Sequence, residues 1–202
     1  MHAFSNFLEV QTRTAWGRIL AEFADFCAPA PASLSLDIGC GPGLLPAILA
    51  GRGCTSLGVD LDEKLLQAKL SPGLCQADAS CLPFPAEGFD LVTSTNVLFL
   101  LDDPVGALAE WRRILKKGGT ICLLNPSHLL SVGAATLVAE SRHLEGPARE
   151  SLLGWARNAE AHARWTEMET GDLVSAAGLQ LAESILRVGP GFARLSRARK
   201  PG

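Results

Sequence analysis

A glycine-rich turn after an apolar segment is the first feature of this sequence that could do chemistry. Residues 36–43 read Leu-Asp-Ile-Gly-Cys-Gly-Pro-Gly. Because they lack Cβ atoms, Gly39, Gly41 and Gly43 can bend sharply and let a ligand approach main-chain N–H groups at the start of the next helix. The helix dipole favours a carboxylate or a phosphate at that place. The turn therefore predicts a site for a nucleoside cofactor that carries an anionic group.

Acidic residues end two later strand candidates. Asp60 ends the segment Thr55–Asp60, about twenty residues after the turn, where a carboxylate can accept hydrogen bonds from both ribose hydroxyls of an adenosine. A helix N-cap is the alternative role, but Asp62 is better placed for it. Asp78 ends the next strand candidate, where its carboxylate could accept from the exocyclic amine of an adenine while the N–H of Ala79 donates to a ring nitrogen.

The composition is that of a compact folded chain with ample core. Its 202 residues are 48% hydrophobic and 19% charged, with a mean hydropathy of +0.20, which excludes disorder. The net charge of -3 gives no electrostatic footprint for nucleic acid. We interpret the basic end of the chain as a solvated tail, formed by Arg194, Arg197, Arg199 and Lys200. We expect a small-molecule substrate and no nucleic-acid partner.

Neither a membrane nor a metal is expected as a partner. No apolar run is long enough to span a bilayer, and the first residues lack the basic segment, apolar run and cleavage site of a leader, so we expect a cytoplasmic location. The six cysteines form no C-x-x-C motif, and we interpret them as reduced and metal-free. The four histidines show no pairing on one helix face. The oligomeric state stays open.

Hydrophobic periodicity predicts alternating helices and strands. Apolar residues from Trp16 to Cys27 recur at helical spacing, so an amphipathic helix is expected before Pro29. Strand and helix then alternate, which is typical of a parallel sheet. The expected strands are 34–38, 55–59, 74–77, 89–94 and 120–124, and the expected helices are 44–52, 63–70 and 105–115. We interpret Lys116–Gly119 as the end of the last helix.

The remainder of the chain has a different pattern. Residues 127–165 are Ala-rich and helical, with breaks at Gly133, Gly146 and Gly154, and we interpret them as an insertion after the fifth strand. A helix over 167–177 leads into strands 179–188 and 192–197, whose short link predicts an antiparallel hairpin. We expect a single domain, 1–202. Its expected parts are an N-terminal helical cap (1–28), a cofactor-binding core (34–126), the helical insertion or lid (127–165), and a C-terminal helix and hairpin (166–202).

Taken together, these motifs resemble those of the class I S-adenosylmethionine-dependent methyltransferases of the small-molecule type. The resemblance rests on the glycine turn and on four further segments in the same order: Val59–Asp62, Ala77–Ala79 with Leu82–Phe84, Phe89–Val92, and Arg113–Gly119. It covers Leu34 to about Asn125, with a weaker similarity in Gly171–Arg197. Any one of these motifs is unspecific, whereas five in the right order and spacing are specific.

The resemblance implies an α/β fold: a Rossmann-like, doubly wound, seven-stranded and mostly parallel sheet with one antiparallel strand. S-adenosyl-L-methionine would lie across the carboxyl ends of the strands, with its methionyl part at the glycine turn, its ribose at Asp60 and its adenine at Asp78. The implied cofactor-binding residues are Asp37, Gly39, Cys40, Gly41, Asp60, Leu61, Asp78, Ala79, Ser94, Thr95 and Asn96. For Asn96, capping of a turn is an equal alternative.

The implied reaction is methyl transfer to a small-molecule acceptor by in-line displacement. Its rate would come mainly from holding nucleophile, methyl and sulfur collinear with water excluded.

Many relatives carry histidines after the fourth strand, where this chain has Val97–Leu100. No base is therefore assigned; His128 is a candidate, and a loop histidine bound to backbone or water is the alternative. The Asn-Pro-Pro-Tyr motif of amino-methylating enzymes is absent after that strand, which argues against adenine, cytosine or glutamine-amide acceptors. Whether the acceptor atom is O, N or C stays open.

Substrate choice is expected to lie outside the shared core. The N-terminal segment Phe4–Trp16 is a candidate lid, and the insertion is a candidate lid or interface. Arg13 could bind the cofactor carboxylate or be an exposed side chain. The aromatic residues that could line an apolar pocket, or simply belong to the core, are Phe4, Phe7, Trp155 and Trp165.

Two other functions fit part of the pattern. A nicotinamide oxidoreductase also uses a glycine turn and an acid after the second strand, but its fingerprint needs a glycine where this chain has Leu44. The chain has no tyrosine, which excludes the Tyr-Lys relay of short-chain dehydrogenases. A non-catalytic S-adenosylmethionine-binding regulatory or accessory protein is the second alternative. The intact turn, Asp60 and Asp78 favour catalysis over it.

Overall fold

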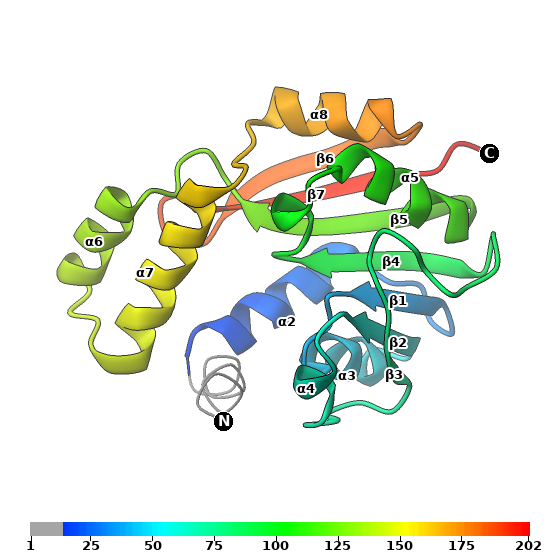
Figure 1. Cartoon of the computed structure of the whole chain (residues 1–202), viewed down its shortest axis with the longest axis horizontal. Coiled ribbons are helices and arrows are strands. Elements are labelled where there is room, and N and C mark those ends of the chain that lie inside the picture. Colours follow the sequence, from blue (N-terminus) through cyan, green and yellow to red (C-terminus); the bar gives the residue numbers. More distant parts are fainter. Residues whose placement is uncertain (1–13) are drawn as a thin grey trace.

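The computed structural model describes residues 14–202 and is built on one seven-stranded sheet (Figure 1). The strand order is β3-β2-β1-β4-β5-β7-β6, and β7 runs antiparallel to both of its neighbours. This confirms the mostly parallel sheet with one antiparallel strand. The strands are β1 Leu34–Ile38, β2 Thr55–Asp60, β3 Leu74–Gln76, β4 Phe89–Thr95, β5 Leu115–Pro126, β6 Gln180–Arg187 and β7 Ala193–Arg199.

Helices cover both faces of this sheet. They are α2 Trp16–Cys27, α3 Leu44–Gly51, α4 Glu63–Leu66, α5 Pro104–Ile114, α6 Val132–Ser141, α7 Gly146–Ala161 and α8 Glu167–Ala176, with a short 3-10 helix, η1, at Leu98–Leu100. α2 and α3 pack on one face, and α5 and α8 pack on the other. In β5, Leu123 belongs to the α5 cluster and Leu124 to the α2 cluster, as the two-residue period of a strand requires.

A crevice is expected at the carboxyl ends of β1 and β4, where the order of the strands along the sheet reverses direction. β1 pairs with β2 on one side and with β4 on the other, so the chain leaves β1 in one direction and returns in the opposite one. The loops that follow β1 and β4 therefore diverge at the carboxyl ends of these strands. The glycine turn and Asn96 lie in those two loops.

The insertion between β5 and α8 is a helical hairpin. α6 and α7 project beyond the carboxyl ends of β4 and β5, with α7 between α6 and the sheet (Figure 1). They have an apolar cluster of their own, formed by Leu130, Ala135, Ala156, Ala159 and Phe192. Of the three expected helix breaks, Gly146 begins α7, whereas Gly133 and Gly154 lie inside helices.

Several element boundaries differ from the expected ones. α4 is a single turn, and β5 begins at Leu115, five residues earlier than expected. Leu115 pairs with Phe89, and Lys200 bonds both Gly118 and Gly119 through its backbone (3.1 and 2.9 Å). With φ at +73° in Gly118, the Lys-Lys-Gly-Gly segment is an irregular part of a strand instead of the end of a helix.

The interpretation of the basic end as a solvated tail was wrong. β7 is an internal strand, and Arg194 and Lys200 are only 5% and 9% exposed. Arg194 donates to the hydroxyl of Ser184 (2.7 Å) and lies 3.5 Å from the carboxylate of Glu167. Partners from distant elements therefore allow these charges to be buried.

Gly58 in β2 should tolerate no side chain. A Cβ atom there would lie 2.7 Å from Sγ of Cys40 and 2.8 Å from a methyl of Leu74, so the glycine turn and β3 would have to move. Gly58→Ala should lower the free energy of unfolding in urea by about 1–3 kcal/mol. In the matched control Gly51→Ala, nothing lies within 4 Å of the added Cβ, and stability should stay equal or rise by up to about 1 kcal/mol. Equal unfolding free energies for the two variants would contradict this packing.

Candidate active site

The glycine turn is held against the end of β2 by backbone hydrogen bonds. The N–H groups of Gly39 and Cys40 both donate to the carbonyl of Val59 (2.8 and 2.9 Å). Gly39 has φ at +73°, and a Cβ on it would lie 2.0 Å from a methyl of Val97. Glycine is therefore required here, both for the backbone conformation and for the close approach of the loop after β4.

Asp60 joins the turn to the start of α4. One carboxylate oxygen accepts from the N–H of Gly41 (2.7 Å) and the other from the N–H of Asp62 (2.9 Å). Each oxygen has a second acceptor position, so the carboxylate can still accept from two ligand hydroxyls. Asp62 accepts from the N–H of Lys64 (2.9 Å) and is the N-cap of α4, as expected.

The loop after β3 is held by a core tryptophan. Trp111 of α5 is fully buried and donates its indole N–H to the carbonyl of Ala79 (2.8 Å). Asp78 accepts from the N–H of Ser80 (2.7 Å) through Oδ1, and no described residue engages its Oδ2. A planar base with an exocyclic amine would find an acceptor there, so the residues of this loop fit an adenine.

An unexpected hydrogen bond joins the insertion to the sheet. The indole N–H of Trp155, on α7, donates to the side-chain oxygen of Asn96 (2.9 Å). Asn96 has φ at +57° and donates its own N–H to the carbonyl of Leu124 (2.8 Å). The ring of Trp155 also packs edge-on against Trp16 of α2, with centroids 5.9 Å apart. Asn96 thus has a role within the protein beside any role toward a ligand.

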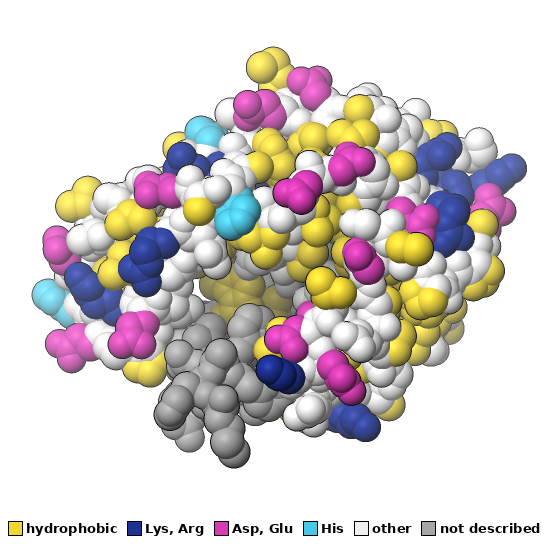
Figure 2. Space-filling view, in the orientation of Figure 1, with side chains coloured by type: hydrophobic (Ala, Val, Ile, Leu, Met, Phe, Trp, Pro, Cys, Tyr) yellow, Lys and Arg dark blue, Asp and Glu magenta, His cyan; other side chains and the backbone are white. Residues whose placement is uncertain are grey.

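These residues surround one large cavity of about 790 Å³. Figure 2 shows the molecule hollowed between the α6–α7 hairpin and the strand ends, with hydrophobic side chains on the floor of the hollow. One end of the cavity is lined by the loops after β1 to β4. The other end is lined by α2, α6, α7 and the link between β6 and β7. The volume is ample for a ligand of nucleoside size together with a second molecule.

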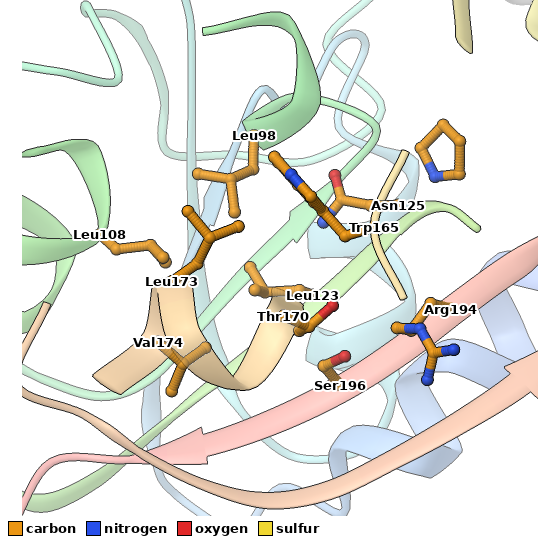
Figure 3. A pocket seen from close by; sticks show the side chains of 11 residues that line it. Leu98, Leu108, Leu123, Asn125, Trp165, Thr170, Leu173, Val174, Arg194 and Ser196 are labelled. Carbon is orange, nitrogen blue, oxygen red and sulfur yellow. The ribbon is translucent and has the colours of Figure 1, made fainter. Parts of the chain in front are cut away.

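A second cavity, beneath α8, is too small for such ligands. It has a volume of about 10 Å³, and its walls come from η1, β5, β7 and α8 (Figure 3). Asn125 and Arg194 face it, and the side-chain oxygen of Asn125 and Nε of Arg194 have no hydrogen-bond partner among the described residues. The large cavity is therefore the candidate active site.

The structure brings most, but not all, of the expected residues to this cavity. Gly39, Asp60, Leu61, Asp78, Ala79, Thr95 and Asn96 line it, and so does Trp155. Asp37, Cys40, Gly41 and Ser94 lie behind its wall, because their side chains or backbones are turned into the sheet and the turn. His128 is exposed in the loop after β5 and does not line the cavity. Arg13, Phe4 and Phe7 lie outside the described residues.

Two further expectations concern metals and membranes. Among residues 14–202, no cluster of three or more His, Cys, Asp or Glu side chains could hold a metal ion. The described cysteines are all free. No helix in the same range is long and apolar enough to cross a bilayer.

Asp37 is a buried acid that supports the site from within the sheet. It is 1% exposed and accepts a hydrogen bond from the hydroxyl of Thr93 on β4 (2.8 Å). The pKa of Asp37 is raised to about 8, mainly by burial. The hydrogen bond from Thr93 lowers this pKa, and the nearby charge of Asp60 raises it. The carboxyl group therefore joins β1 to β4 and is protonated over much of the neutral range.

Asp37→Asn should change how stability depends on pH. The pKa of the carboxyl is about 8 in the folded protein, against about 3.9 in an unfolded chain. The bound proton stabilises the folded protein fully below the pKa of the carboxyl in the unfolded chain. This stabilisation is lost as the pH rises through the pKa of the carboxyl in the folded protein. Between about pH 5.5 and 7.5, the urea unfolding free energy of the natural protein should fall more steeply than that of D37N, by up to about 1.4 kcal/mol per pH unit. Parallel curves would refute the raised pKa.

The sequence of this core matches a known family. Residues 36–123, from β1 into β5, match the family described as "Methyltransferase domain". This part of the chain is therefore similar to a methyltransferase domain. The strand order of the whole sheet is the one expected for the class I enzymes, whose methyl donor is S-adenosylmethionine.

Three known proteins illustrate the similarity. The ubiquinone biosynthesis O-methyltransferase of Thiobacillus denitrificans is 33% identical over 131 residues, which are 57% of this chain and 56% of that protein. A methyltransferase of Mesorhizobium loti has a TM-score of 0.69 at 20% identity, over 92% of this chain and 97% of that one. Magnesium protoporphyrin IX methyltransferase of Synechocystis, solved with bound SAH, has a TM-score of 0.65 at 16% identity, over 91% and 82%. The two structures show the shared fold, and the chain spans about half the length of the curated relatives it matches.

Trp155→Phe should loosen the contact between the α6–α7 hairpin and the sheet. The change removes the hydrogen bond to Asn96 but keeps an aromatic ring, so opening of α6 and α7 should become easier by about 1 kcal/mol. Amide hydrogen exchange in these helices should then be about fivefold faster. Trp16→Phe keeps that hydrogen bond and should leave the exchange rates nearly unchanged. Equal rates in both variants would show that the bond does not hold the hairpin.

Proposed function

We propose that the protein is an S-adenosylmethionine-dependent methyltransferase that methylates a small-molecule acceptor by in-line displacement. The observation that carries the proposal is the Asp60 carboxylate, held between Gly41 and Asp62 and facing the large cavity. Asp60 would bind the ribose, and Asp78 with Ala79 would bind the adenine. The turn at Gly39 would pack against the methionyl part. When bound, S-adenosylmethionine supplies a methyl group on a positively charged sulfur.

The chain's own contribution to the reaction is position and the exclusion of water. Thr95 at the end of β4 and Asn96 and Val97 just after it line the cavity. They would hold an acceptor in line with the methyl group, and such proximity can supply about 7–11 kcal/mol of a barrier. The hairpin and α2 would close the site from water.

An oxygen nucleophile is the acceptor atom that we propose. The similarity to a ubiquinone biosynthesis O-methyltransferase supports it. The apolar part of the cavity, lined by Ile19, Leu152 and Phe192, suits an acceptor with a hydrophobic body. A hydroxyl that ionises readily would need the least help from a protein base.

Calorimetric titration with S-adenosylmethionine, S-adenosylhomocysteine and NADH tests the cofactor. The first two should bind and NADH should not. Asp60→Ala removes one or two charge-assisted hydrogen bonds and should weaken S-adenosylhomocysteine binding by about 2–4 kcal/mol. Asp62→Ala, which removes the cap of α4, is the matched control and should weaken it by less than about 1 kcal/mol.

Transfer of a labelled methyl group to hydroxylated small molecules tests catalysis. Labelled product should form with the natural protein and be lost with D60A at low donor concentration. Binding of both adenosyl compounds without any transfer would favour the non-catalytic alternative. Binding of NADH alone would overturn the proposed function.

A further inference from the structure

The charged residues that line the large cavity are separated by sign. Among the described lining residues, the acids are Asp60, which ends β2, and Asp78, which follows β3. The bases are Arg18 on α2 and Arg142 at the end of α6. The acids face the place proposed for the adenosine. The guanidinium of Arg142 belongs to the hairpin, and α6 lies on the far side of α7 from the ends of β1 and β4 (Figure 1). The cavity thus has a positive group at the hairpin end.

Arg142 has no partner within the described part of the protein. Its side chain makes no hydrogen bond or ion pair there, and it does not bond the last carbonyls of α6, which a basic side chain at a helix end often does. Three other arginines are engaged: Arg52 with Asp25, Arg113 with Glu110, and Arg164 with the carbonyl of Leu130. Arg18, the other base of the cavity, has no side-chain partner among the described residues either, so the test below includes it. Arg142 is exposed and lines the cavity, so no described side chain or carbonyl occupies its five donors.

The wall between this arginine and the strand ends is apolar. Its lining side chains are Val138, Leu144, Ala148, Leu152 and Trp155, with the hydroxyl of Ser151 among them. Arg142 itself is exposed to solvent, and this wall lines the cavity beside it. A ligand that fills this end of the cavity should combine a hydrophobic body with one anionic group.

We propose that the methyl acceptor is a hydrophobic molecule with a carboxylate, and that Arg142 binds this carboxylate. The proposal rests on the proposed function, because it assigns the hairpin end of the cavity to the acceptor. The guanidinium and the carboxylate match in geometry and form paired hydrogen bonds. Arg142 is then a specificity-determining residue: it fixes one end of the acceptor, and the apolar wall directs the other end toward the methyl group.

Binding of simple acids to the protein saturated with S-adenosylhomocysteine tests this assignment. The probes are naphthoate and laurate, each compared with its primary amide, and the readout is the fluorescence of Trp16 and Trp155, which line the cavity. At least one acid should bind ten times or more tightly than its amide. Arg142→Gln should reduce this preference by about ten- to hundredfold, the usual value of hydrogen bonds to a charged group. Arg142→Lys should restore part of it.

Matched controls separate this site from general charge effects. Arg149→Gln removes an arginine of α7 that does not line the cavity, and it should leave the preference unchanged. Arg142→Gln should also leave the affinity for S-adenosylhomocysteine unchanged, which shows that the variant is folded.

The proposal is overturned if neither acid binds, if acids and amides bind equally, or if Arg18→Gln instead of Arg142→Gln removes the preference. Failure of S-adenosylhomocysteine to bind would overturn the proposed function itself. Normal binding of that compound without a preference for acids would overturn the assignment of Arg142 alone.

Discussion

The arrangement of the candidate active site depends on the hydrogen bonds that the carboxylate of Asp60 accepts. It binds the N–H of Gly41 after β1 and the N–H of Asp62 after β2, so two loops from neighbouring strands are fixed to one side chain. Gly41 is buried, and a buried N–H group needs such an acceptor. Because the same oxygens face the cavity, a ligand hydroxyl would meet a group that is already in place, and little ordering would be needed on binding.

Much of the core could be predicted from the sequence because its signals are local. β1, β2 and β4 are short apolar runs that end at glycine or polar residues, and parallel strands place their carboxyl ends at one edge of a sheet. Gly39, Asp60 and Asp78 could therefore be assigned to one site from their spacing alone. The inward orientation of Asp37 and Ser94 could not be predicted, because it depends on hydrogen bonds between neighbouring strands. The hydroxyl of Thr93 donates to Asp37, and the hydroxyl of Ser94 donates to the carbonyl of Ile38.

The features that the sequence did not reveal depend on contacts between distant residues. Lys116–Gly119 has the composition of a helix end, but backbone bonds between Gly118–Gly119 and Lys200 make it part of a strand. Arg194 has the composition of a basic tail, but Ser184 and Glu167 allow it to lie inside the sheet. The bond between Trp155 and Asn96 joins residues 59 positions apart, and no periodic pattern connects them.

The hairpin has an apolar cluster of its own, around Leu130, Ala156 and Phe192, separate from the two clusters that cover the sheet. Substitutions within that cluster can therefore change the shape of the chamber without disturbing the packing beneath the glycine turn. In evolutionary terms, the part of the chain that we propose to contact the acceptor can diverge at a different pace from the part that we propose to bind the donor. If that division holds, recombination between related proteins at the ends of the hairpin would exchange acceptor preferences as a unit, provided that the hydrogen-bonded Trp155 and Asn96 are kept.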